Sequence, residues 1–360
     1  MSYSQLKSVL TTDHNVYNDS KLKTRNLSLD FARGMAVIFM VFVHVLSTYA
    51  SESVQYSPFG YIIDFLGGPP AAPVFMFAMG IFFVLSSRSQ SMFKGILKGF
   101  MLLLVGIVLS FLRYDILTIF TEGFNTVNIS STGNIIAFWE VDILQFAGCA
   151  YILMSIIKRL FNKPIYWLLI GTVVMIISPY IWGIESNIGI INWIFNYIWG
   201  YTDLVYFPLF GWLYYPLIGM VFGVMIKSSK DIDKLFRSLI KPGLVLLLIG
   251  SIITATNFDF HIGDYFHSGQ GSMIWIMGFV LIWLWLISKI VNKAPNSKVV
   301  NIVNYFGKNT TSIYIIHWLL VSWATLLLGE MCYGYIITSL LMIVILTVST
   351  LISKLIKIKL

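Results

Sequence analysis

The chain is a series of long apolar runs separated by short connections rich in lysine and arginine. Most runs have the length of about 17–25 residues that an α-helix needs to cross a bilayer, and none shows the alternation of a membrane β-barrel. The pattern therefore predicts about ten transmembrane helices. We expect them at residues 32–50, 59–86, 96–112, 136–157, 164–183, 205–226, 242–256, 272–288, 310–328 and 334–353.

Composition supports this interpretation. Of the 360 residues, 58% are hydrophobic and 11% are charged, against about 45–50% and 25% in soluble domains. These values exclude a water-soluble protein and a disordered chain. We predict an all-α polytopic membrane protein, with residues 1–26 as a cytoplasmic leader and 27–360 as a single transmembrane domain.

The charges predict an orientation. With ten spans, 23 of the 24 lysines and arginines fall on the side of the termini, and only Arg113 falls on the other side. The positive-inside rule then places both termini in the cytoplasm. The net charge of +8 is thus explained by the membrane topology and does not indicate a nucleic-acid partner. Contact with anionic membrane lipid explains most of it, and binding of an anionic cytosolic ligand is the alternative for a few residues.

Ionisable groups inside a membrane span are costly and are candidates for function. Arg33 and His44 are eleven residues apart on the first span, which is about 16 Å and close to three helical turns. One face of this helix therefore presents a cation at the cytoplasmic rim and an imidazole near the midplane. His317 on the ninth span lies at a similar expected depth, although either histidine could be a packing residue.

A second unusual segment interrupts the long apolar run at 59–86. Residues 64–73 begin with Asp64 and contain two glycines and three prolines, which a regular span does not accommodate. We expect a broken or re-entrant helix whose N–H groups point into a cavity. A short outer loop is the alternative.

The outer side is rich in acids and aromatic residues. The fourth span opens with Glu140, Asp142 and Gln145, which are candidates to bind the hydroxyl groups of a substrate. Residues 186–203 are too polar to span and are expected to form an interfacial helix or a surface loop. The two cysteines, Cys149 and Cys332, form no Cys/His cluster, so we expect neither a metal site nor a disulfide framework.

The first span resembles the start of the transmembrane acyltransferases. It opens with residues 27–34 and continues to His44, and an Arg-x10-His pattern on this span marks the acyltransferase 3 branch. Four internal blocks of sequence, given below, look more like the heparan-α-glucosaminide N-acetyltransferase branch. That branch, however, generally has Asn at the position of His44. His317 completes a Tyr-x-x-His pattern seen in both branches. The internal blocks are residues 73–80, 142–145, 207–213 and 307–314.

The resemblance implies an enzyme that takes an acyl group, usually acetyl, from cytosolic acyl-CoA. It implies delivery across the bilayer to a hydroxyl or amine of a glycan or another cell-envelope acceptor. His44 is carried over as the essential histidine, and His317 is the second catalytic candidate. Candidates to bind acetyl-CoA, through its phosphates, are Arg33, Arg25, Lys308 and Asn309. Candidates to bind the acceptor are Asp64, Glu140, Asp142 and Gln145.

Two other classes of function fit parts of the pattern. A broken helix, a midplane histidine and outer acids also suit a transporter or exporter of a polar or lipid-linked solute. A transporter often shows an internal repeat, however, and none is visible. A sensor or scaffold gives no reason for a midplane histidine in line with a rim arginine. High usage of Lys, Ile and Asn favours a prokaryotic cell membrane.

Overall fold

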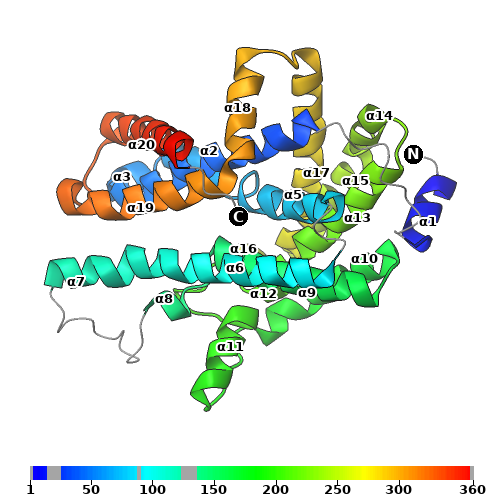
Figure 1. The fold of residues 1–360 in the computed structure, drawn as a ribbon, viewed down its shortest axis with the longest axis horizontal. Coiled ribbons are helices and arrows are strands. Elements are labelled where there is room, and N and C mark those ends of the chain that lie inside the picture. Colours follow the sequence, from blue (N-terminus) through cyan, green and yellow to red (C-terminus); the bar gives the residue numbers. More distant parts are fainter. Residues whose placement is uncertain (1–2, 14–25, 87–90, 123–135, 357–360) are drawn as a thin grey trace. The chain divides into compact units, whose positions relative to one another are not determined.

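The computed structural model of the protein describes residues 3–13, 26–86, 91–122 and 136–356. These residues are mainly helical and contain no β-strand; the helices are shown in Figure 1. They group into two compact units, each made of separate stretches of chain. We call the unit of residues 27–74, 107–140 and 293–360 the histidine unit, because it contains His44 and His317. The second unit comprises residues 1–26, 75–106 and 141–292.

The helices confirm the predicted class. Among the described residues, nine helices are long and apolar enough to cross a membrane. The sixth predicted span, 205–226, overlaps the shorter apolar helix α13, Tyr214–Ser228. The third helix is longer than predicted: it does not end at residue 112 but continues to Glu122. The chain is therefore an integral, multi-pass membrane protein.

The histidine unit is built around α2 (Leu27–Tyr49), which contacts α4, α18, α19 and α20. The π-helical turn η4 (Phe111–Asp115) continues the third helix from α6 (Met92–Ser110) and leads into α7 (Ile116–Glu122), and η4 contacts α19. The remaining helices are α3 (Glu52–Gln55), α4 (Pro58–Gly67), α8 (Ile136–Trp139), α18 (Lys298–Lys308), α19 (Thr310–Leu328) and α20 (Tyr335–Leu355).

The predicted break in the second apolar segment is confirmed. Helix α4 ends at Gly67 and α5 (Ala72–Leu85) begins after a turn at residues 68–71. The break coincides with the glycines and the first two prolines of this segment, which do not fit a regular helix.

The C-terminal end of α2 is fixed by the connection between α19 and α20. The backbone N–H of Met331 donates to the carbonyl of Thr48, and those of Cys332 and Tyr333 donate to Tyr49. The phenol of Tyr49 in turn donates to the carbonyl of Val321 on α19 at 2.6 Å. These bonds hold the half of α2 that carries His44 against α19.

The second unit contains the remaining long helices. Part of the predicted leader forms a helix here, α1, whose Val9 is buried and which contacts α10 and α13. The segment 186–203 was expected to form an interfacial helix or a surface loop. It contains helix α11 at residues 189–199. Its location at a membrane surface stays a prediction. The helices are α1 (Tyr3–Thr11), α5, α6 (Met92–Ser110), α9 (Ile143–Leu160), α10 (Pro164–Ile181), α11 (Gly189–Trp199), α12 (Leu209–Trp212), α13, α14 (Ile232–Arg237), α15 (Ile240–Thr256), α16 (Phe258–Ile262) and α17 (Gln270–Lys293).

Candidate functional site

The two candidate histidines, 273 residues apart in sequence, form a hydrogen-bonded pair in the histidine unit. His44 Nδ1 on α2 lies 3.0 Å from His317 Nε2 on α19, and the two ring planes differ by 11°. His317 is fully buried. Two imidazoles that meet inside a membrane protein are a candidate for proton transfer, since histidine is the commonest general base in enzymes.

The hydrogen bonds determine which nitrogens carry protons. His317 Nδ1 lies 3.1 Å from the backbone carbonyl of Ile313. A carbonyl oxygen only accepts, so His317 Nδ1 carries a proton, and Nε2 of the neutral ring accepts. His44 Nδ1 must then donate to His317 Nε2. The nitrogen of a neutral His44 that has no proton is therefore Nε2, and this atom is the base of the pair.

Helices α2 and α19 run in the same direction at this site. Arg33 Nη2 donates to Thr310 Oγ1 at 3.3 Å, and His44 meets His317 further along both helices. From the first contact to the second, the residue number increases on both helices, so the two helices are parallel. This agrees with the ten-span interpretation, in which the first and ninth spans enter from the same side.

The predicted donor-binding residues gather at the start of α19. Arg33 contacts Thr310, Lys308 is exposed at the end of α18, and Asn309 joins the two helices, its amide donating to the carbonyl of Tyr305 at 2.9 Å. Arg25 lies outside the described residues. Arg33 thus lies at the same end of the unit as Lys308 and Asn309, although more than 270 residues separate it from them.

The predicted acceptor-binding residues differ in their surroundings. Asp64 is exposed on α4. Glu140 is completely buried in the histidine unit. Asp142 and Gln145 are buried in the second unit, where Asp142 caps α9 by accepting from the N–H of Ile143 at 2.7 Å. The capping bond gives Asp142 a structural role in the start of α9.

The partner of Glu140 is Arg113, which the sequence analysis placed outside the spans as the one outer cation. The structure places Arg113 inside a long helix, in the π-turn η4, with 3% of its surface exposed. Its Nη1 lies 3.4 Å from Glu140 Oε1. Tyr114 links the two, since Arg113 Nη2 donates to its phenol and the phenol donates to Glu140, both at 3.0 Å.

This ion pair reaches the histidines through Trp318. The guanidinium carbon of Arg113 lies 3.4 Å from the centroid of the Trp318 ring, and the His44 ring lies 3.9 Å from it, tilted by 25°. Two groups this close to one ring cannot share a face, so they lie on opposite faces of the indole. Arg113 was detectable in the sequence as an isolated cation on a side that otherwise has none. Trp318 was not, apart from its position next to His317.

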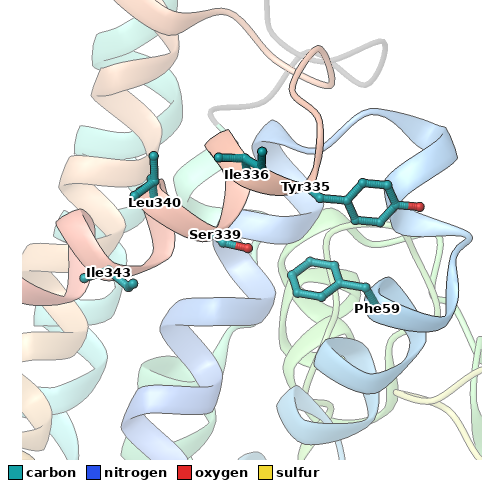
Figure 2. A pocket seen from close by; sticks show the side chains of 6 residues that line it. All are labelled: Phe59, Tyr335, Ile336, Ser339, Leu340 and Ile343. Carbon is teal, nitrogen blue, oxygen red and sulfur yellow. The ribbon is translucent and has the colours of Figure 1, made fainter.

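The histidine unit also has an open apolar hollow of about 350 Å³ between α4 and α20. Figure 2 shows the rings of Phe59 and Tyr335 beside each other with Ser339 next to them; the two ring centroids are 5.9 Å apart. No histidine, carboxylate or cation lines this hollow. It therefore offers no general base for group transfer, and the histidine pair remains the candidate site.

Comparison with known proteins identifies the family. The model of the acyltransferase 3 family, an acyltransferase domain, matches residues 26–357, which is nearly the whole chain. The chain belongs to the acyltransferase 3 family. No curated protein matches the sequence. The protein is therefore a membrane acyltransferase, and its family agrees with the Arg-x10-His pattern of α2. Among the described residues of this acyltransferase, no group of three His, Cys, Asp or Glu side chains is placed to hold a metal ion.

Proposed function

We propose that this membrane acyltransferase transfers an acyl group, in the first place acetyl, from cytosolic acyl-CoA to a hydroxyl or amine of an extracytoplasmic glycan or another envelope acceptor. The observation that carries the proposal is the histidine pair, with His44 Nε2 as the base, on the same continuous helix as Arg33. One helix thus joins a phosphate-binding end to a proton-accepting end.

The donor end is argued from charge. Arg33 and Lys308 lie at the start of α19 beside Asn309, and this is the end that the positive-inside rule assigns to the cytoplasm. Guanidinium and ammonium groups form strong, charge-assisted hydrogen bonds with phosphate oxygens. Acyl-CoA is a cytosolic donor with phosphates at one end and a thioester at the other, so it matches this arrangement.

The reaction at the histidine end follows from the proton positions. His44 Nε2 takes the proton of the acceptor hydroxyl or amine as its oxygen or nitrogen attacks the thioester carbonyl. The tetrahedral intermediate collapses, the carbon–sulfur bond breaks, and the CoA sulfur leaves with a proton from His44. The Nδ1–H of His44 donates to His317, and His317 Nδ1–H donates to Ile313. His317 thus orients His44 and stabilises its protonated form, the role that the aspartate has toward the histidine of a Ser-His-Asp triad.

The test uses the purified protein in lipid nanodiscs with radiolabelled acetyl-CoA. A chitosan oligosaccharide is the acceptor probe, because it offers hydroxyl groups and amines in one molecule, and a mannan oligosaccharide and propionyl-CoA complete the set. We expect label in an oligosaccharide and release of CoA thiol, both at least about 100-fold slower in His44→Ala. Thiol release that equals the His44→Ala background with every donor and acceptor would overturn the proposal.

A further inference from the structure

The third helix carries a π-turn beside the histidine pair. Residues Phe111–Asp115 form this turn in the middle of an otherwise regular helix that runs from Met92 to Glu122. Single π-turns inside α-helices are rare and often occur at functional sites. Here the turn carries Arg113, and its side chain is buried against Trp318.

Two tryptophans of α19 hold this turn. Trp318 packs its ring on the guanidinium of Arg113. One and a half turns later, Trp323 Nε1 donates to the backbone carbonyl of Leu112 at 3.1 Å, and its ring meets Phe120 edge-on at 5.4 Å. The helix that carries His317 is therefore attached to the π-turn at two points.

Burial of this ion pair is costly. Moving a guanidinium and a carboxylate out of water costs several kcal/mol per ion, and apolar residues of similar size often stabilise a protein as well or better. Stability alone therefore does not explain why Arg113 and Glu140 stand where α19 meets the third helix. A planar guanidinium, in contrast to a lysine ammonium, can lie flat on an aromatic ring and be held by two acceptors in its own plane.

We propose that Arg113 is a positioning residue for acyl transfer: Glu140 and Tyr114 fix its guanidinium, which presses Trp318 flat against His44 and so holds the imidazole with Nε2 toward the reactants. The proposal rests on the proposed function, because it concerns the same base. Each link is a contact of a few ångströms: Glu140 to Arg113 at 3.4 Å, Arg113 to Trp318 at 3.4 Å and Trp318 to His44 at 3.9 Å. Removal of the first link loosens the last.

The first test removes both charges of the pair together, in the double variant Arg113→Met/Glu140→Gln, so that neither is left without the other. We expect kcat for acetyl transfer from acetyl-CoA to the chitosan oligosaccharide to fall about 10- to 100-fold, the usual cost of a misplaced catalytic group, with an unchanged KM for acetyl-CoA. In the His44→Ala background the same double variant should cost less than about twofold, because Arg113 acts through His44. A full repeat of the loss in that background, or an unchanged kcat, would overturn the proposal.

The matched control is Lys289→Met. Lys289 also lies over a tryptophan ring, 4.1 Å from the centroid of Trp285, but it is exposed and belongs to the second unit. Its removal should leave kcat unchanged. If the double variant does not fold, Trp318→Leu and Trp318→Phe replace it: the phenylalanine keeps a flat ring against His44 and should retain most of the kcat that the leucine loses. Equal losses in these two variants would contradict the positioning role.

A second measurement does not depend on activity. In protein with ¹⁵N-labelled histidines, the spectrum of His44 should show one neutral tautomer with the proton on Nδ1, assigned among the five histidines by the signal missing in His44→Ala. The double variant should show the average of two tautomers. If wild-type protein transfers no acyl group, the proposed function fails while this spectrum still decides the positioning role; an unchanged His44 spectrum in the folded variant would overturn it.

Discussion

Gly34 on α2 faces the backbone carbonyl of Val303 on α18 so closely that a side chain at this position would collide with it. Gly307, four residues further along α18, meets the carbonyl of Asp30 in the same way. Small residues allow two helix backbones to approach in a membrane. This crossing lies directly beside Arg33 and fixes the donor end of α2.

Gly34→Ala is therefore expected to destabilise the protein by about 1–3 kcal/mol, the usual cost of overpacking. The measurement is the melting temperature of the protein in detergent. Gly189→Ala is the control, since nothing lies within 4 Å of an added methyl group there, and it should melt with the wild type. Equal melting temperatures for the two variants would show that α2 and α18 are further apart than described.

The two histidines are expected to contribute unequally to turnover. His44→Ala removes the base itself and should lower kcat about 10²- to 10⁴-fold. His317→Ala removes only the acceptor for His44 Nδ1 and should cost less. Both should keep their affinity for CoA in calorimetry. A dead His317→Ala beside an active His44→Ala would exchange the two roles.

Arg33→Ala is expected to weaken CoA binding by about tenfold, because it removes one charge-assisted contact with phosphate. The measurement is calorimetric titration with CoA. Arg237→Ala is the matched control: Arg237 is exposed on α14 and also lies in a connection assigned to the cytoplasm. A folded Arg33→Ala protein with wild-type CoA affinity would remove Arg33 from the donor site.

Asp264 provides a test of stability against pH outside the spans. Partial burial raises the pKa of Asp264, but hydrogen bonds from His267 and from the backbone N–H groups of Phe266 and His267 outweigh it, so that the pKa lies below its ordinary value. A carboxyl with a lowered pKa stabilises the fold at neutral pH, and this contribution disappears as the pH falls through that pKa. Asp264→Asn should therefore melt lower than wild type at pH 7.

The difference between Asp264→Asn and wild type should shrink below about pH 4, because the carboxyl is protonated first in the unfolded chain and, at a lower pH, in the folded chain. Asp259→Asn is the control, because Asp259 is exposed on α16. A constant difference from pH 7 to pH 3 would mean that the charge of Asp264 does not contribute to stability.

The orientation is tested with single cysteines in a protein without Cys149 and Cys332. Cysteines at Lys230 and Lys298 should react with an impermeant thiol reagent only from the cytoplasmic side. A cysteine at Asp259, which is exposed, should react only from the outside. Labelling of Asp259→Cys from the cytoplasm would overturn the ten-span orientation.

The sequence predicted the helices well because hydrophobic length is a local property. The break near Gly68 was predictable for the same reason, since glycine and proline act on their own backbone. The pairing of His44 with His317 was expected only as a similar depth on two spans. The hydrogen bond between them depends on how α2 and α19 pack. That packing cannot be deduced from the sequence of either helix alone.

Arg113 shows where local reasoning ends. A charged residue at the end of an apolar run normally marks the end of a span, so residue 112 was the expected boundary. The helix continues because Glu140, 27 residues later, neutralises the charge and Trp318, more than 200 residues later, covers it. Glu140 was predicted to bind the acceptor substrate because it lies at the outer end of the fourth span. Its contact with Arg113 could not be predicted from composition or spacing.

In the proposed reaction, the unbroken course of α2 from Leu27 to Tyr49 sets a minimum length for the acyl donor. Eleven residues separate Arg33 from His44, which is about 16 Å along the helix axis. A donor held at its phosphate by Arg33 must therefore extend a long arm before it presents its carbonyl to His44. Acyl phosphates, in which the carbonyl carbon is bonded directly to the phosphate oxygen, are too short to reach both residues at once.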